Sequence, residues 1–162
     1  MAMTLQSLLL FQVDNISRLK TDWIDITEEP LDAGEVHNFL YRSEGGGVCV
    51  FAGTTRRITG DKSTEYLSYE SHISMALKEM QALSKKAREQ WPILRTVLLH
   101  RIGDVKVGEP SVLIGVASAH RGPAFEAARF LIDELKKSVQ IWKQEHYTNK
   151  TTEWVQTDWP AE

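Results

Sequence analysis

The sequence predicts an α+β fold in which helices pack against one layer of β-sheet. Apolar, strand-like runs alternate with two long segments of helical period, so the chain reads as two β–α–β units followed by further strands. No Pro/Gly-rich linker, internal repeat or low-complexity tract divides it. The length of 162 residues suits one domain, and 42% hydrophobic and 25% charged residues are typical of a globular protein.

The first half of the chain is expected to contain strands and helices in alternation. Asp32, followed three residues later by Glu35, is typical of a helix start and predicts a short helix to about Ser43. The expected strands are Trp23–Thr27, Val48–Thr54 and Thr64–Glu70, with a break at Gly45–Gly47 and a mobile polar loop at Ile58–Ser63. A long helix over Ile73–Trp91 would bury Met75 or Ala76, Met80, Leu83 and Ala87, and would end at Pro92.

The second half is expected to hold a buried strand, a central helix and two late strands. Pro123 suits the first helical position, and the helical pattern continues to Val139. The remaining expected elements are the strands Thr96–His100, Ser111–Ala119, Ile141–His146 and Thr152–Gln156, with a turn-rich link over Gly103–Pro110. Residues 1–22 are poorly determined and form an N-terminal extension to a domain over residues 23–162.

The central helix places a lysine at the rim of its apolar side. At about 100° per residue, five apolar side chains share one arc: Phe125, Ala128, Ile132, Leu135 and Val139. Lys136 falls about 20° from the first of these. Such a lysine either extends past its apolar neighbours into water or lines a pocket, and the helix alone leaves both readings open.

The corner between the buried strand and this helix carries basic residues. His120 and Arg121 follow the apolar run Val112–Ala117 and precede the predicted helix start. Backbone N–H groups at a helix start have no intrahelical partner, so this corner suits an anion.

Several motifs resemble the family of catalytic (large) subunits of molybdopterin synthase. They occur in the family's order over roughly Gly47 to Trp154: Gly53-Thr54-Thr55-Arg56, His100-Arg101-Ile102-Gly103 with Gly108-Glu109, His120-Arg121, Phe125-Glu126-Ala127 with Ile132-Asp133-Glu134-Leu135-Lys136, and Ile141-Trp142-Lys143-Gln144-Glu145. Gln140 departs from the family, where proline commonly precedes the Ile-Trp-Lys run, and so does Arg57, often a small polar residue.

The resemblance implies a fold, an activity and a set of site residues. The fold would be an α/β-hammerhead-like sheet with helices and a small extra β portion. The activity would be transfer of two sulfurs to cyclic pyranopterin monophosphate (precursor Z), making molybdopterin. Lys136 would be the main catalytic lysine and Lys143 the second. Both would also belong to the substrate-binding set, with the other members Thr54, Thr55, Arg56, His120, Arg121, Gln144 and Glu145.

The implied sulfur donor is the C-terminal thiocarboxylate of a small ubiquitin-like subunit, and this chain would form a homodimer at the centre of a heterotetramer. Because the thiocarboxylate is the nucleophile, the site needs positive charge rather than a cysteine. Cys49, the single cysteine, lies between Val48 and Val50 and is expected to be an inert, buried residue. Arg56, His120, Arg121, Lys136 and Lys143 are candidates for one basic pocket, with scattered surface charges as the alternative.

Composition limits the other classes of function. A net charge of −3 creates no global field for nucleic acid, and one cysteine excludes a disulfide framework and a Cys-rich metal site. His37, His72 and His146 lack ligand spacing, so neither metal nor cofactor is expected, and His100-Arg101 is expected to be structural. Leu8–Phe11 is too short to span a membrane, which favours the cytoplasm. The alternatives are a non-catalytic module that binds a ubiquitin-like tail or phosphorylated ligand, and, ranked last, a phosphate-ester hydrolase.

Overall fold

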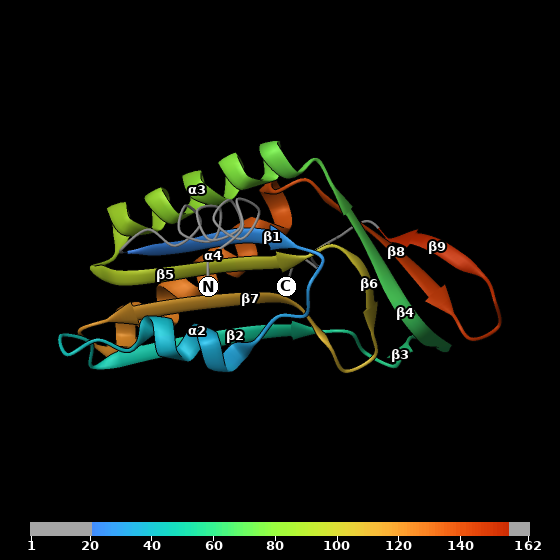
Figure 1. Cartoon of the computed structure of the whole chain (residues 1–162), viewed down its shortest axis with the longest axis horizontal. Coiled ribbons are helices and arrows are strands. Elements are labelled where there is room, and N and C mark those ends of the chain that lie inside the picture. Colours follow the sequence, from blue (N-terminus) through green and yellow to red (C-terminus); the bar gives the residue numbers. More distant parts are fainter. Residues whose placement is uncertain (1–20, 156–162) are drawn as a thin grey trace, which may run out of the picture.

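A computed structural model describes residues 21–155 and arranges them around a four-stranded sheet (Figure 1). The strand order is β1 (Asp22–Thr27), β5 (Ile93–Arg101), β7 (Pro110–Ser118) and β2 (Gly47–Thr54). β1 runs parallel to β5, whereas β7 is antiparallel to both β5 and β2. In the described part of the chain β2 is therefore an edge strand.

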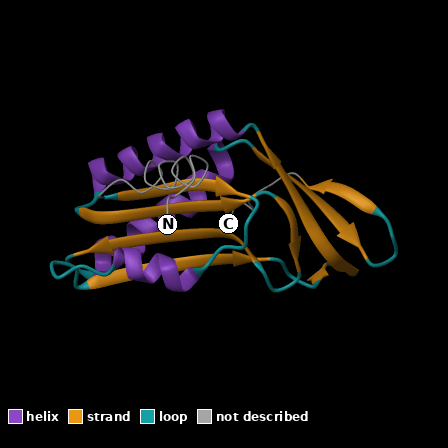
Figure 2. Ribbon diagram, in the orientation of Figure 1, coloured by secondary structure: helices purple, strands orange, loops and turns teal. Residues whose placement is uncertain are grey.

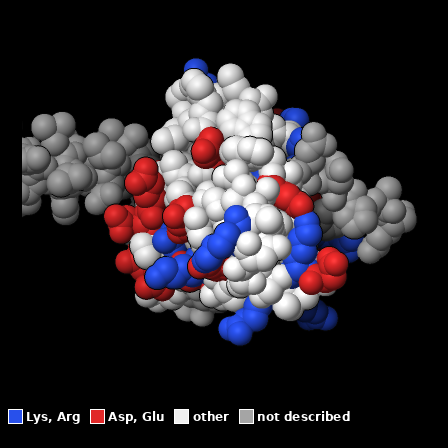
Figure 3. Space-filling model, turned by 90° about the vertical axis from the view of Figure 1, so that its right-hand side faces the viewer, with Lys and Arg blue, Asp and Glu red and all other residues white. Residues whose placement is uncertain are grey.

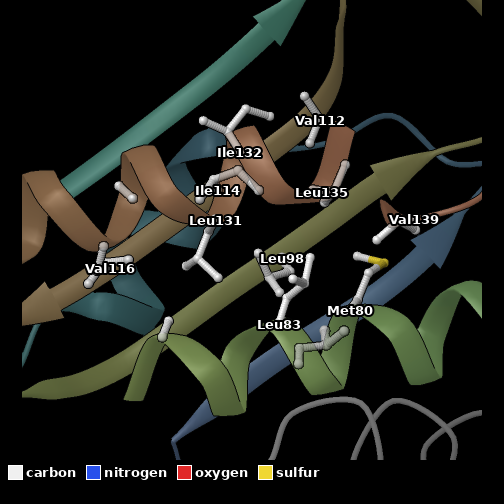
Figure 4. Close-up of a cluster of buried hydrophobic side chains, with 14 of the residues drawn as sticks. Met80, Leu83, Leu98, Val112, Ile114, Val116, Leu131, Ile132, Leu135 and Val139 are labelled. Carbon is white, nitrogen blue, oxygen red and sulfur yellow. The ribbon is translucent and has the colours of Figure 1, made fainter. Parts of the chain in front are cut away.

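Helices cover both faces of this sheet, and each face has its own core. Side chains alternate along β5, so Leu98 packs toward α3 (Ile73–Gln90) and α4 (Arg121–Ser138), while Val97 and Leu99 pack toward α2 (Ala33–Leu40). The larger core joins α3 and α4 to the sheet through Met80, Leu83, Leu98, Ile114 and Leu131 (Figure 4). Burial of these side chains on two faces is the main source of stability.

A second sheet projects from one end of the first (Figure 2). Its path is β3 (Ile58–Thr59), β4 (Lys62–Ser71), β8 (Ile141–Tyr147) and β9 (Thr152–Val155), and β6 (Gly103–Lys106) also pairs with β4. β4 pairs with β8 through seven residue pairs that include Leu67 with Glu145 and Tyr69 with Lys143. The junction of the two sheets is where the candidate site lies.

The predicted α+β class is confirmed. Helices lie on both faces of the main sheet because β5 and β7 are apolar on both sides. The expected mobile loop at Ile58–Ser63 instead forms the β3–β4 hairpin around Gly60, which takes a positive φ of 63°. The turn-rich link after Ile102 contains β6.

The other predicted helices and strands are present, and their ends differ from the predicted ones by a few residues. Asp32 caps α2 by accepting hydrogen bonds from the backbone of Gly34 and Glu35, but the helix ends at Leu40 rather than near Ser43. In α3, Ala76 is buried and Met75 is exposed. The N-terminal extension predicted over residues 1–22 lies almost wholly outside the described residues, as does the last residue of the strand predicted to end at Gln156. Among residues 21–155 no helix is long and apolar enough to cross a membrane.

The central helix α4 starts two residues before Pro123, and its buried side is rotated away from Phe125 relative to the predicted arc. Ala128, Ile132, Leu135 and Val139 are buried as expected, whereas Phe125 is 64% exposed. The buried stripe is centred instead on Ala124, Ala127, Leu131 and Leu135. Because α4 packs over β7 and the edge strand β2, its flank beyond β2 has no sheet beneath it. Phe125 lies on that flank.

The glycine run before β2 allows a close approach between strand and helix. A Cβ on Gly47 would lie 2.8 Å from both the backbone nitrogen and the Cα of Arg121. A Cβ on Gly46 would lie 2.4 Å from the carbonyl oxygen of Ala119. Backbone atoms cannot move away cheaply, so glycine at these positions lets β2 start directly beside the N-terminus of α4.

We expect Gly47→Ala to lower the free energy of unfolding by about 1–3 kcal/mol, because the new methyl group overpacks against the Arg121 backbone. Urea denaturation checks this. The matched control is Gly122→Ala, also at the start of α4, where a Cβ would meet nothing within 4 Å. The control should be neutral or stabilise by up to about 1 kcal/mol, since alanine favours a helix. Equal stability of both variants and the wild type would contradict the packing argument.

Candidate functional site

A cavity of about 290 Å³ lies where the two sheets meet, beside the C-terminal end of α4. The main sheet supplies the ends of β2 and β5 and the beginning of β7, and the second sheet supplies β4, β8 and β9. Its lining residues are Gly53, Thr54, Arg56, Thr59, Leu67, Tyr69, His100, Ser111, Val112, Ile132, Leu135, Lys136, Val139, Ile141, Lys143, Glu145 and Val155. The apolar stripe of α4 thus forms one wall of the cavity, and polar and apolar residues of the strands form the rest.

Three cationic side chains converge on this cavity from three separate elements. Arg56 follows β2, Lys136 lies in the last turn of α4, and Lys143 lies on β8. The C-terminal end of a helix carries a partial negative charge, which favours a cation at the position of Lys136. Lys136 is exposed as a residue and still lines the cavity beside Ile132 and Leu135. Of the two alternatives for Lys136, the structure therefore supports the one in which its side chain lines a pocket.

Lys143 is the least exposed of the three cations. Its burial lowers the pKa of the ammonium group, and the positive charges of Lys136 and Arg56 lower it further, while Glu145 opposes the shift. A lysine whose pKa is lowered holds its proton less tightly and exchanges it more readily near neutral pH. An anion entering the cavity would relieve the repulsion among the three cations.

Glu145 is a buried carboxylate that ties the second sheet together. It is 4% exposed and lies two residues beyond Lys143 on the same face of β8. It accepts hydrogen bonds from the hydroxyl groups of Thr59, at 2.8 Å, and Thr64. These bonds hold the β3–β4 hairpin against β8. The primary role of Glu145 in this geometry is to position the cavity wall.

The structure divides the nine predicted site residues into separate groups. Thr54, Arg56, Lys136, Lys143 and Glu145 line the cavity. Gln144 does not, because successive side chains of a strand point to opposite faces and Gln144 follows Lys143. Thr55 is also absent from the lining. It is buried, and its backbone bonds to Glu109 and Gly108 at 3.1 and 2.9 Å.

His120 and Arg121 lie at the opposite end of α4, so the single basic pocket expected from the sequence does not form within one chain. Both residues are exposed and line a second hollow of about 500 Å³ with Gly46, Ala119, Gly122 and Pro123. Fifteen residues of helix separate Arg121 from Lys136, which corresponds to about 22 Å. The sequence could not reveal this separation, because motif order carries no information on distance.

Sequence reasoning missed four polar residues of the cavity wall: Thr59, Tyr69, His100 and Ser111. His100 was expected to be structural, yet it lines the cavity with its ring edge-on to Tyr69, the ring centroids 5.0 Å apart. Burial lowers the pKa of His100 to about 4 and raises the pKa of Tyr69. The signal in the sequence was a histidine at the end of a strongly apolar strand, next to the buried Leu98 and Leu99.

Gln140 makes a bond that the family's usual proline could not make. Its backbone N–H donates to Glu79 at 3.0 Å, and its carbonyl oxygen accepts from Ser71 at 3.0 Å. These two contacts anchor the start of β8, three residues before Lys143. Proline lacks the N–H group and could not make the bond to Glu79.

Cys49 lies away from the cavity and is partly buried against the larger core. Burial raises the pKa of its thiol, which disfavours the reactive thiolate.

No group of three or more His, Cys, Asp or Glu residues that could hold a metal ion occurs among residues 21–155. Seen from the end that carries the second sheet, the upper part of the view is largely uncharged, and acidic and basic side chains are interspersed across the middle and lower parts (Figure 3).

Known proteins resemble this chain in sequence and in structure. The model of the MoaE protein family matches residues 26–138. The molybdopterin synthase catalytic subunit of Rattus norvegicus is 37% identical over 145 residues, which cover 90% of this chain and 72% of the rat protein. A crystal structure of molybdopterin synthase from Staphylococcus aureus superposes with a TM-score of 0.78 at 33% identity, covering 85% of this chain and 98% of that one.

The fold also occurs in a more distant protein of Helicobacter pylori 26695. That structure is described as a protein–protein complex of subunits 1 and 2 of molybdopterin-converting factor, and it superposes with a TM-score of 0.67 at 22% identity, covering 86% of this chain and 92% of that one. The family match spans well over half of this chain, and the rat protein is similar over most of its length. The chain therefore belongs to the MoaE protein family, whose members include molybdopterin synthase catalytic subunits.

Proposed function

We propose that this protein is the catalytic subunit of a molybdopterin synthase, a sulfurtransferase that converts precursor Z to molybdopterin in the cytoplasm. The observation that carries the proposal is the convergence of Arg56, Lys136 and Lys143 on one cavity with an apolar wall. Family membership supports the same activity. Residues 23–162 would form the single domain that performs it.

The chemistry of the cavity suits a reaction in which charge develops on oxygen. Precursor Z is a phosphorylated heterocycle, and the sulfur arrives as a thiocarboxylate that is already a nucleophile. Fixed cations stabilise the negative charge that develops in such a transfer and hold the departing phosphate oxygen. Lys136 and Lys143 are the proposed catalytic residues, with Arg56 and Thr54 as substrate-binding residues beside them. Cys49 takes no part.

The proposed sulfur donor is the C-terminal tail of a small ubiquitin-like subunit. The Helicobacter protein of this fold is described as a complex of two subunits, which supports a partner of this kind. A cavity with an apolar wall suits an extended tail, because the tail buries its backbone while its terminal carboxyl group meets the lysines. The apolar residues Ile132, Leu135 and Val139 would contact the tail.

A homodimer would bring His120 and Arg121 to the cavity of a second copy. The cavity lies at the C-terminal end of the edge strand β2, and Gly47, at its N-terminal end, lies against Arg121. Antiparallel pairing of β2 with β2 of a second copy places the start of one strand beside the end of the other. Each cavity would then receive the His120-Arg121 corner of the other chain.

Exposed aromatic residues support this arrangement. Phe51 on β2 is 40% exposed, and Phe125 on the uncovered flank of α4 is 64% exposed. Pairing across β2 would set the two α4 helices side by side and bury both residues. The homodimer would be the centre of a heterotetramer with two small subunits at its ends.

The direct test of the activity is a reconstitution. The purified chain is mixed with precursor Z and with a thiocarboxylated small subunit, and molybdopterin is measured by its fluorescent oxidation product. We expect product only when all three components are present. Binding of the partner and precursor without any product would instead support a non-catalytic module.

Lys136→Met should fold normally and make almost no molybdopterin. The substitution keeps the side-chain length and removes the charge and the proton, so turnover should fall by roughly 10²–10³ or more while the melting temperature stays within a few degrees. The matched control is Lys137→Met, the next residue, whose ammonium pairs with Glu134 at 3.1 Å on the helix surface. Near wild-type product formation by Lys136→Met would remove Lys136 from the mechanism.

Cys49→Ala should retain most of the activity. Sulfur comes from the partner in the proposed reaction, so loss of the thiol should cost only packing at the edge of the core, about 1–2 kcal/mol of unfolding free energy. Multiple-turnover assays with Cys49→Ala and Cys49→Ser check this. Loss of turnover in a folded variant would mean that sulfur passes through this chain.

Arg121→Ala should weaken binding of precursor Z by about 1.5–3 kcal/mol, because it removes a charge-assisted contact. The shared site is tested by mixing this variant with Lys136→Met. A mixed dimer contains one cavity with both residues intact, so random mixing should restore about a quarter of wild-type activity. If His120 and Arg121 act within their own chain, mixing restores nothing.

A further inference from the structure

The cavity wall contains a buried imidazole that the proposed chemistry does not use. His100 is 5% exposed, lies at the end of the buried part of β5, and lines the cavity together with Tyr69 and Ser111. Its ring meets the Tyr69 ring edge-on at 5.0 Å between centroids, with an interplanar angle of 70°. The strand and the tyrosine ring together hold the imidazole in one orientation.

The hydrogen bonding of His100 determines which nitrogen carries the proton. Nδ1 lies 2.8 Å from the carbonyl oxygen of Arg101. A carbonyl oxygen only accepts, so Nδ1 must be the donor. Burial, with a further contribution from the charge of Lys136, lowers the pKa of His100 to about 4, so the ring is neutral at neutral pH. Nε2 is then a hydrogen-bond acceptor with a lone pair.

An acceptor of this kind is unusual for this cavity. Arg56, Lys136 and Lys143 are donors without accepting capacity. Glu145 is a charged acceptor, and its Oε1 already accepts from the hydroxyl groups of Thr59 and Thr64. His100 adds a neutral nitrogen acceptor, which can bind a donor group of a ligand without adding negative charge to a wall that attracts anions.

We propose that His100 is a specificity-determining residue of this site, whose neutral imidazole accepts a hydrogen bond at Nε2 from an N–H or O–H group of the substrate. The cations would bind the anionic part of the substrate, and His100 would accept a hydrogen bond from a donor group on the heterocycle of the substrate. A phosphorylated heterocycle with N–H groups satisfies both requirements, whereas inorganic phosphate satisfies only the first. This inference rests on the proposed function for the identity of the substrate.

Two substitutions separate the two nitrogens of His100. Glutamine places an amide near the position of Nε2 and restores an acceptor there, whereas asparagine places its amide near Nδ1 and keeps only the donor to Arg101. We expect calorimetry to show that His100→Gln binds precursor Z within about threefold of the wild type, whereas His100→Asn loses roughly three- to tenfold or more. Both variants should bind inorganic phosphate like the wild type. Equal affinities of the Gln and Asn variants for precursor Z would overturn the proposal.

A second measurement needs no variant. Nitrogen-15 NMR of the ligand-free wild type should show His100 as the neutral Nδ1–H tautomer from pH 8 down to about pH 5. An imidazolium or an Nε2–H tautomer at pH 7 would overturn the proposal even if the variants unfold. Binding of precursor Z without formation of molybdopterin would instead remove the proposed activity and leave the comparison of Gln and Asn intact. A wild type that does not bind precursor Z would overturn both.

Discussion

The packing of the apolar stripe of α4 across β7 and β2 is the contact on which both the core and the cavity depend. Small residues at the start of the stripe, Ala124, Ala127 and Ala128, let the helix approach the sheet closely, and the glycines before β2 complete this approach. Larger residues follow toward the C-terminus. Because the helix extends to the end of the main sheet, Ile132 and Leu135 belong to the core and also line the cavity. One continuous surface therefore stabilises the fold and shapes the site.

Three positively charged side chains line the cavity and lie close together even when no ligand is bound. Burial lowers the pKa of Lys143, and repulsion from Lys136 and Arg56 lowers it further. Glu145 is the one carboxylate among the described lining residues, and the low pKa of His100 leaves that imidazole neutral at pH 7. Three cations against one carboxylate make the lining net positive although the whole chain carries a net charge of −3. A bound anion offsets the repulsion among the three cations, so substrate binding also stabilises the cavity wall.

The edge strand β2 connects the two polar regions of the molecule. Its C-terminal end opens into the cavity, and its N-terminal end lies against the helix start that carries His120 and Arg121. An unpaired strand edge flanked by exposed phenylalanines is a surface that proteins normally cover. A two-fold axis through the middle of β2 would cover it and would exchange the two ends between copies. The length of α4 would then matter for function, because it sets the distance between the cavity and the His120-Arg121 corner of the same chain.

The sequence by itself determined the local features of this protein. Apolar periodicity and the Asp32 cap located the elements to within a few residues, and the motifs identified the lysines that line the cavity. Only the tertiary structure decided which of these residues meet. Within one chain, Gln144 does not line the cavity because side chains alternate along β8, Thr55 is buried outside the lining, and Arg121 lies at the far end of α4. Phe125 is exposed because the helix lies over the edge of the sheet. His100 enters the site because the second sheet packs Tyr69 against the end of β5. Helical period and motif order depend on neighbours along the chain, whereas distance, facing and burial depend on contacts between residues far apart in sequence.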